Sequence, residues 1–173
     1  MIAAELTVVS QASWPEPDDR ELPPVPGFIL SSFNPLVAEV ADRCLRRHYG
    51  EPPLTPERGG AVAMIIVSAS GDAVSADHVA RTVDAGSRVG PLFFFQSVPN
   101  AIAGHVAARW GLGGPVVCLC PTGDPRANGL AQAAALIEDG DASAALVVLV
   151  EQESQVDGGP AGAAAVLVCT EGQ

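Results

Sequence analysis

Apolar runs without charge alternate along the chain with segments in which apolar residues recur at helical spacing. The runs predict strands at residues 6–9, 61–67, 115–120, 144–150 and 163–169. The run at 61–67 is typical of a strand covered on both faces, and we expect 115–120 to be buried as well. Helical spacing predicts one helix from a Ser32 or Asn34 cap to Gly50, and others, the first with Ser75 as its cap, at 75–84, 99–110 and 125–139.

The order of these elements predicts the fold class. Strands that alternate with helices favour a mainly parallel sheet with helices on both faces. The polar turn at 152–159 has no helical pattern, so we expect the last strand to be antiparallel. Proline-rich segments predict surface loops at 14–26 and 50–60. Residues 1–173 are therefore expected to form a single α/β domain around a five-stranded mixed sheet.

The helix predicted at 125–139 is unusual in composition. Nearly every position from 127 to 137 is small or apolar, with Asn128 and Gln132 as the interior exceptions. A helix on the outside of a single sheet needs only one apolar stripe. We therefore expect another chain or a second copy to cover this helix, with Ala133 and Ala134 in the contact.

Charge and length exclude several classes of partner. The formal net charge is −11, and all nine basic residues are arginine, so nucleic acid is not expected as a partner. The apolar runs are too short to span a bilayer, and no positive charge precedes the apolar N-terminus. We expect no membrane anchor and no signal peptide, and we expect a cytoplasmic protein.

The cysteines and histidines do not predict a metal centre. Cys118 and Cys120 are the only close cysteine pair, and on a strand both would face the same side, where we interpret them as core residues. The histidines have no metal-type spacing relative to each other or to this pair: His48, His78 and His105. We expect reduced thiols, no metal and no cofactor.

Several motifs in one register resemble the N-terminal half of the β-ketoacyl synthases, which have the thiolase fold and extend acyl chains on carrier proteins. Residues 100–115 match the pattern N-x-x-A-G-H-x-x-x-x-x-G-L-x-G-P, and 137–143 match I-x-x-G-D-A-D with Ser143 in place of the last aspartate. Residues 58–71 resemble the preceding strand and its glycine turn, and 160–168 resemble a later strand in which Pro160 and Ala161 depart from the family pattern. Residues 23–45 are similar to short ketosynthase-like proteins. The resemblance implies a thiolase-like half.

The same register implies that the chain lacks the family's chemistry. The nucleophilic cysteine of the family falls on Gly123, and a shifted alignment offers Cys120 or Thr122 instead. Asp124 would repel a developing oxyanion. The family also draws two histidines and a lysine from its C-terminal half, whereas this sequence ends near the end of the first half and has no lysine. We interpret His105 as a packing residue, and we expect no condensing activity from this chain alone.

The resemblance implies a non-catalytic subunit, similar to chain-length factors, that pairs with a ketosynthase and shares its acyl channel. Two alternatives stay open: half of a split enzyme completed by another chain, and an acyl-binding or scaffold homodimer. The predicted partner contacts comprise the edge strand at 115–120, with the residues Val116, Cys118 and Cys120, and the phenylalanines Phe93, Phe94 and Phe95, which could equally be core residues.

One basic cluster is a candidate for docking an acyl carrier protein, because carrier proteins are acidic. It consists of four arginines: Arg43, Arg46, Arg47 and Arg58. The alternative is a solvated helix face that complements the helix dipole.

Overall fold

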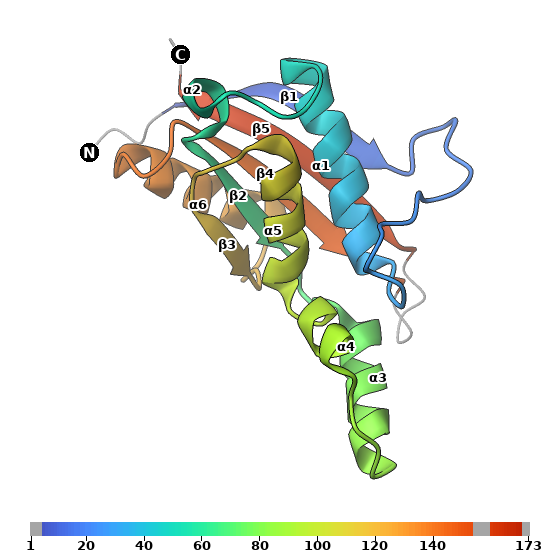
Figure 1. Cartoon of the computed structure of the whole chain (residues 1–173). Coiled ribbons are helices and arrows are strands. Elements are labelled where there is room, and N and C mark those ends of the chain that lie inside the picture. The colour runs from blue at the N-terminus through green and yellow to red at the C-terminus, as the bar shows by residue number, and fades with distance from the viewer. Residues whose placement is uncertain (1–4, 154–159, 171–173) are drawn as a thin grey trace.

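A five-stranded mixed sheet forms the centre of the computed structural model, which describes residues 5–153 and 160–170 (Figure 1). The strand order is β1-β5-β4-β2-β3. β2 is parallel to β3 and β4, whereas β5 is antiparallel to β4 and β1. The predicted fold class and the antiparallel last strand are confirmed. The strands comprise β1 (Leu6–Trp14), β2 (Val62–Val67), β3 (Val116–Leu119), β4 (Ala144–Glu151) and β5 (Gly162–Thr170).

Helices lie on both faces of the sheet. The larger core packs α1 and α5 against one face, and the smaller core packs α6 against the other. Alternate residues of β2 therefore enter different cores: Met64 and Ile66 belong to the first, and Ile65 to the second. The helices comprise α1 (Phe33–Tyr49), α2 (Pro56–Gly59), α3 (Ala73–Asp84), α4 (Pro91–Gln96), α5 (Pro99–Trp110) and α6 (Pro125–Glu138).

A glycine brings α6 close to the sheet. A Cβ atom at Gly129 would lie 2.5 Å from Cγ1 of Val147 and 3.1 Å from Cγ2 of Val67. One turn later, Ala133 is completely buried against the same face. Small residues on the inner side of α6 thus serve this chain's own packing.

The segment 73–98 forms an arm that extends away from the sheet (Figure 1). It contains α3 and α4 and leaves the body at the end of β2, beside the edge strand β3. Among its helical residues, only Ser75 and Gln96 are buried. The arm is therefore held mainly at its root.

Several local predictions need correction. β1 continues to Trp14, because residues 10–14, three of them polar, still pair with β5. A short helix, α2, lies within the predicted loop at 50–60. Asp72 rather than Ser75 caps α3, since its carboxylate accepts from the Ser75 N–H at 3.1 Å. Most of the predicted 152–159 turn lies outside the described residues.

In the described ranges, no helix is long and apolar enough to cross a membrane.

Candidate functional site: a self-capped elbow and an exposed edge

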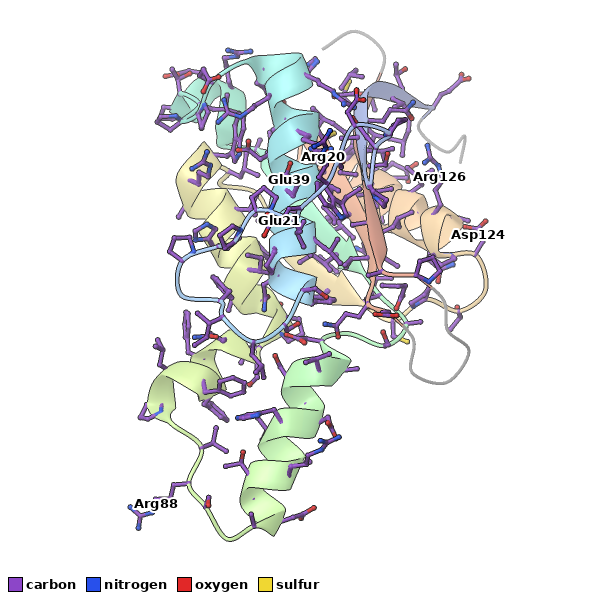
Figure 2. All side chains as sticks on the ribbon, turned by 90° about the vertical axis from the view of Figure 1, so that its right-hand side faces the viewer. Arg20, Glu21, Glu39, Arg88, Asp124 and Arg126 are labelled. Atoms are coloured by element: carbon purple, nitrogen blue, oxygen red, sulfur yellow. The ribbon has the colours of Figure 1, made fainter. Side chains whose placement is uncertain are left out.

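The turn from β3 into α6 contains Gly123, where the resemblance to the ketosynthases predicts the nucleophile position. Gly123 has a φ of 89°, a left-handed conformation that favours glycine. The next residue, Asp124, is the N-cap of α6, and its Oδ1 accepts a hydrogen bond from the Ala127 N–H at 2.9 Å. Figure 2 shows Asp124 at the start of this helix. The helix N-terminus, which attracts anions, is thus capped by the chain's own carboxylate.

Asn128 fixes the conformation of this turn. Its Oδ1 accepts from the Thr122 N–H at 2.8 Å, and its Nδ2 donates to the Thr122 carbonyl at 3.3 Å. This pair of hydrogen bonds closes the chain between the strand and the first turn of α6. The Thr122 hydroxyl also donates to the Asn128 Oδ1, at 3.4 Å, so it takes part in the local structure of the turn.

A second carboxylate occupies the neighbouring turn after β2. Glu151, at the end of β4, accepts from the Ala69 N–H at 2.5 Å and from the Ser70 hydroxyl at 2.7 Å. The carboxyl ends of β2, β3 and β4 lie at the same end of the sheet, because the three strands are parallel. At this end of the sheet, backbone N–H groups in the turn after β2 and in the turn before α6 are therefore already paired with carboxylates of the same chain.

Cys120 lies immediately after β3 and is exposed. Its thiol donates to the Ala69 carbonyl, with an S···O distance of 3.7 Å. The three histidines lie apart from one another, and each packs against an aromatic ring. The ring pairs are His105 with Phe28, His78 with Phe93, and His48 with Tyr49. No Cys–His hydrogen bond forms within the described parts of the chain.

No group of three possible metal-ligating side chains occurs in the residues that the structure describes.

Strand β3 is an edge strand of the sheet, as the resemblance predicts, so the expectation from its apolar pattern that it is buried is wrong. It pairs with β2 alone, and its other edge carries unpaired backbone groups. Val116 is 40% exposed, and Cys118 is also exposed. Both side chains are available for the contact with a partner that the sequence predicts.

The three phenylalanines were predicted to be either partner contacts or core residues, and they differ in exposure. Phe94 and Phe95 are 66% and 62% exposed, whereas Phe93 is half-buried, with its ring centroid 4.5 Å from that of His78. Core packing therefore does not account for Phe94 and Phe95. Sequence reasoning missed the exposed apolar residues Ile29, Leu30 and Val98, although an apolar pair directly after Gly27 and Phe28 was a possible signal.

The two alanines assigned to a contact also differ. Ala133 is completely buried against this chain's own sheet, so its assignment to an interface needs correction. Ala134 is half-buried. The side of α6 that faces outward instead carries the exposed residues Ala127, Ala131 and Ala135.

The arginine cluster is largely neutralised by carboxylates of the same chain. Arg43 donates to both oxygens of Asp19 at 2.7 Å and to Glu39 at 2.6 Å. Arg47 forms a forked pair with Glu16 at 2.8 and 2.9 Å. These hydrogen bonds lower the pKa of the Asp19 and Glu16 carboxyls below their ordinary values.

The other two arginines of the cluster lie near the C-terminal end of α1. Arg46 pairs with Asp42 at 2.6 Å and with Glu51. Arg58 stacks over the Tyr49 ring, with its guanidinium carbon 5.1 Å from the ring centroid. Docking of a carrier protein at these arginines stays a prediction.

The sequence of this chain matches a known protein family. Residues 12–157 match the model of the beta-ketoacyl synthase N-terminal domain. The chain belongs to this family. The resemblance inferred from residues 100–115 and 137–143 is thereby confirmed. No curated protein sequence matches this chain.

Solved structures share the fold. The chain is similar to one in the complex of the ketosynthase ApeO with its chain length factor ApeC from Xenorhabdus doucetiae (18% identity, TM-score 0.72, 95% of this chain and 79% of that one). It is also similar to the ishigamide ketosynthase/chain length factor (19%, 0.69, 85% and 46%). A third match is a beta-ketoacyl synthase from Burkholderia phymatum STM815 (14%, 0.68, 88% and 45%). The chain spans less than half the length of the last two.

Proposed function

We propose that this chain is a non-catalytic ketosynthase-like subunit, which pairs with a ketosynthase or a related partner in bacterial-type fatty acid or polyketide chain assembly. The observation that carries the proposal is the elbow before α6. Gly123, which the resemblance aligns with the family's nucleophile, has a left-handed backbone conformation there, and the Asp124 carboxylate caps the helix. A carboxylate at this place opposes the negative charge that develops on a substrate carbonyl oxygen.

Two surfaces support a partner. An unpaired edge strand is a template for main-chain hydrogen bonds with another chain, and β3 is such an edge. Exposed Phe94 and Phe95 lie on the arm that begins beside this edge. Among the similar structures, the ApeO and ApeC complex pairs a ketosynthase with its chain length factor. In the proposed function, this chain forms an equivalent pair with a ketosynthase. The pair is proposed to be cytoplasmic.

The arginine cluster bears on where a carrier protein would dock. One similar structure contains an acyl-carrier protein in complex with its ketosynthase. In this chain, a carrier protein would have to compete with Asp19, Glu16 and Asp42 for the arginines of the cluster. We therefore place the main carrier contact on the partner ketosynthase rather than on this subunit.

Exposed Cys120 favours one alternative, a split enzyme in which another chain completes the site. Its thiol lies three residues before Gly123. If this alternative holds, Cys120→Ser would abolish acyl transfer in the assembled complex. Under the proposed function, the same variant leaves the activity of the complex unchanged.

Co-purification tests the proposed function. The tagged chain is co-expressed with the β-ketoacyl synthase encoded nearest to its gene, and the molar mass of the purified complex is measured by light scattering. A stoichiometric complex that loses condensing activity when the synthase's own nucleophilic cysteine is replaced supports the proposal. A stable homodimer that ignores the synthase overturns it in favour of the scaffold alternative.

A further inference from the structure

Helix α6 covers only part of its face of the sheet. It packs mainly on β2 and β4, so the same face of β5 and β1 forms a trough beside the helix. Two hollows lie along this trough, with volumes of about 300 and 340 Å³. Ser13 and Ala164, which are cross-strand partners, line the second hollow, and Gln11 beside them is exposed. In the described structure, the trough is therefore an open sheet face next to a helix.

One side of α6 borders the trough. Arg126 lines both hollows, and steps of four residues place three further side chains on the same side of the helix. This set, the α6 row, consists of Arg126, Leu130, Ala134 and Glu138. The two ends of the row are exposed, and its two central members are half-buried. The row thus runs from a cation through a large and a small apolar side chain to an anion.

The charges of the α6 row oppose the dipole of their own helix. Arg126 lies in the first turn, where the dipole favours anions, and Glu138 lies in the last turn, where the dipole favours cations. The last turn contains no basic residue. Arg126 extends from the start of the helix (Figure 2) and forms no ion pair with any described residue. The positions of these two charges are therefore unfavourable in a single copy, whereas a neighbouring helix of opposite direction would make them favourable.

We propose that a second copy of this chain covers the trough, with the two α6 helices antiparallel about a two-fold axis. The midpoint of the row is Gln132. An axis at this midpoint brings Arg126 of one copy beside Glu138 of the other, and Leu130 beside Ala134. Each charge then meets its opposite and each large side chain meets a small one, twice in the contact. A rise of 1.5 Å per residue separates the two ion pairs by about 18 Å.

This contact goes beyond the proposed function and is compatible with it. The sheet has β1 at one edge and β3 at the other, so a copy seated over β5 and β1 leaves the β3 edge free. A ketosynthase can therefore bind at β3 while the second copy occupies the trough. Together the two contacts predict an assembly with two copies of this chain and two ketosynthase subunits.

Charge reversal tests the contact between copies. Arg126→Glu and Glu138→Arg are made alone and together in the full chain, and Arg88→Glu on the arm is the control. Sedimentation velocity measures the dimer Kd, and circular dichroism measures folding. Each single reversal changes two symmetry-related pairs, so we expect the Kd to rise about tenfold or more. The double reversal restores both pairs and should return the Kd to within about threefold of the wild-type value.

The same variants separate a contact between copies from a role within one copy. Each single reversal aligns a charge with the helix dipole, so it should not impair folding although it weakens association. A wild-type chain that stays monomeric overturns the inference, and so does a double reversal that associates no better than the single ones.

The purified ketosynthase encoded nearest to the gene provides the last test. If the reversals weaken binding to this ketosynthase and leave self-association unchanged, the trough belongs to the ketosynthase and the inference fails. A one-to-one complex that contains a single copy of each chain also overturns it and leaves the proposed function intact. A dimer of this chain that responds to the reversals but does not bind the ketosynthase supports the inference and contradicts the proposed function.

Discussion

The side-chain amide of Gln152 donates from Nε2 to the hydroxyl of Ser31 at 2.7 Å, across 121 residues of sequence. Its Oε1 also accepts from the Val74 N–H at 3.2 Å. One buried amide at the end of β4 therefore joins the loop before α1 to the root of the arm. A second connection runs beside it, from Asn34 Nδ2 to the Asp72 carboxylate at 3.3 Å.

Replacing Gln152 with leucine should destabilise the protein. The substitution keeps most of the volume but leaves the Val74 N–H and the Ser31 hydroxyl without their buried partner. We expect a loss of about 1–3 kcal/mol in the free energy of unfolding, measured by urea denaturation. Gln132→Leu, on half-buried α6, is the control and should change this free energy by less than about 0.5 kcal/mol. Equal stability of the two variants would show that the amide does not anchor the arm.

The parts of the fold that the sequence predicted well are those with local signals. Both limits of α5 were predicted, because Pro99 occupies the first turn and Gly111 ends the helix in a left-handed conformation. The antiparallel β5 followed from the link without helical pattern. In these cases, one or two residues determine the outcome without help from the tertiary structure.

The errors arise where tertiary structure decides. An apolar run such as 115–120 looks alike in the centre and at the edge of a sheet, so the exposure of β3 was not predictable from its composition. The second half of β1 includes three polar residues, yet it pairs with β5 because the edge of the sheet is free there. At the site, the sequence singled out Gly123 and Asp124 as candidates, but the capping bond of Asp124 and the exposure of Ile29 required the coordinates.

Two helical glycines should respond in opposite directions to alanine. At Gly129 the new Cβ atom would lie 2.5 Å from Cγ1 of Val147, so Gly129→Ala should lower the melting temperature through overpacking of about 1–3 kcal/mol. At Gly104 the added Cβ atom meets open space, and Gly104→Ala should stabilise α5 by about 0.5–1 kcal/mol. Thermal unfolding of both variants checks the pair. A neutral Gly129→Ala would contradict the close packing of α6 on β4.

The ion pair between Asp19 and Arg43 should make stability depend on pH. The hydrogen bond from Arg43 lowers the pKa of Asp19 in the folded state below its ordinary value of 3.8. The stabilisation is therefore complete above that ordinary value and is lost as the pH falls through the lower folded-state pKa. We expect the free energy of unfolding to fall less steeply in Asp19→Asn than in the wild type as the pH is lowered below about 4. Asp18→Asn is the neighbouring control, and an identical pH profile for wild type and Asp19→Asn would contradict the pairing.

Restoring a cysteine at the elbow should not restore the chemistry. Gly123→Cys places a side chain on a backbone with a φ of 89°, which should cost about 1–2 kcal/mol of stability. The new thiol would also stand beside the Asp124 carboxylate, which disfavours the thiolate and opposes an oxyanion. We expect a lower melting temperature and no acyl transfer from an acyl-thioester substrate, followed by mass spectrometry of the protein. The double variant Gly123→Cys, Asp124→Ala, which lacks the carboxylate beside the new thiol, is the control for the effect of that carboxylate. Stoichiometric acylation of the single variant at position 123 would contradict the view that Asp124 keeps this elbow non-catalytic.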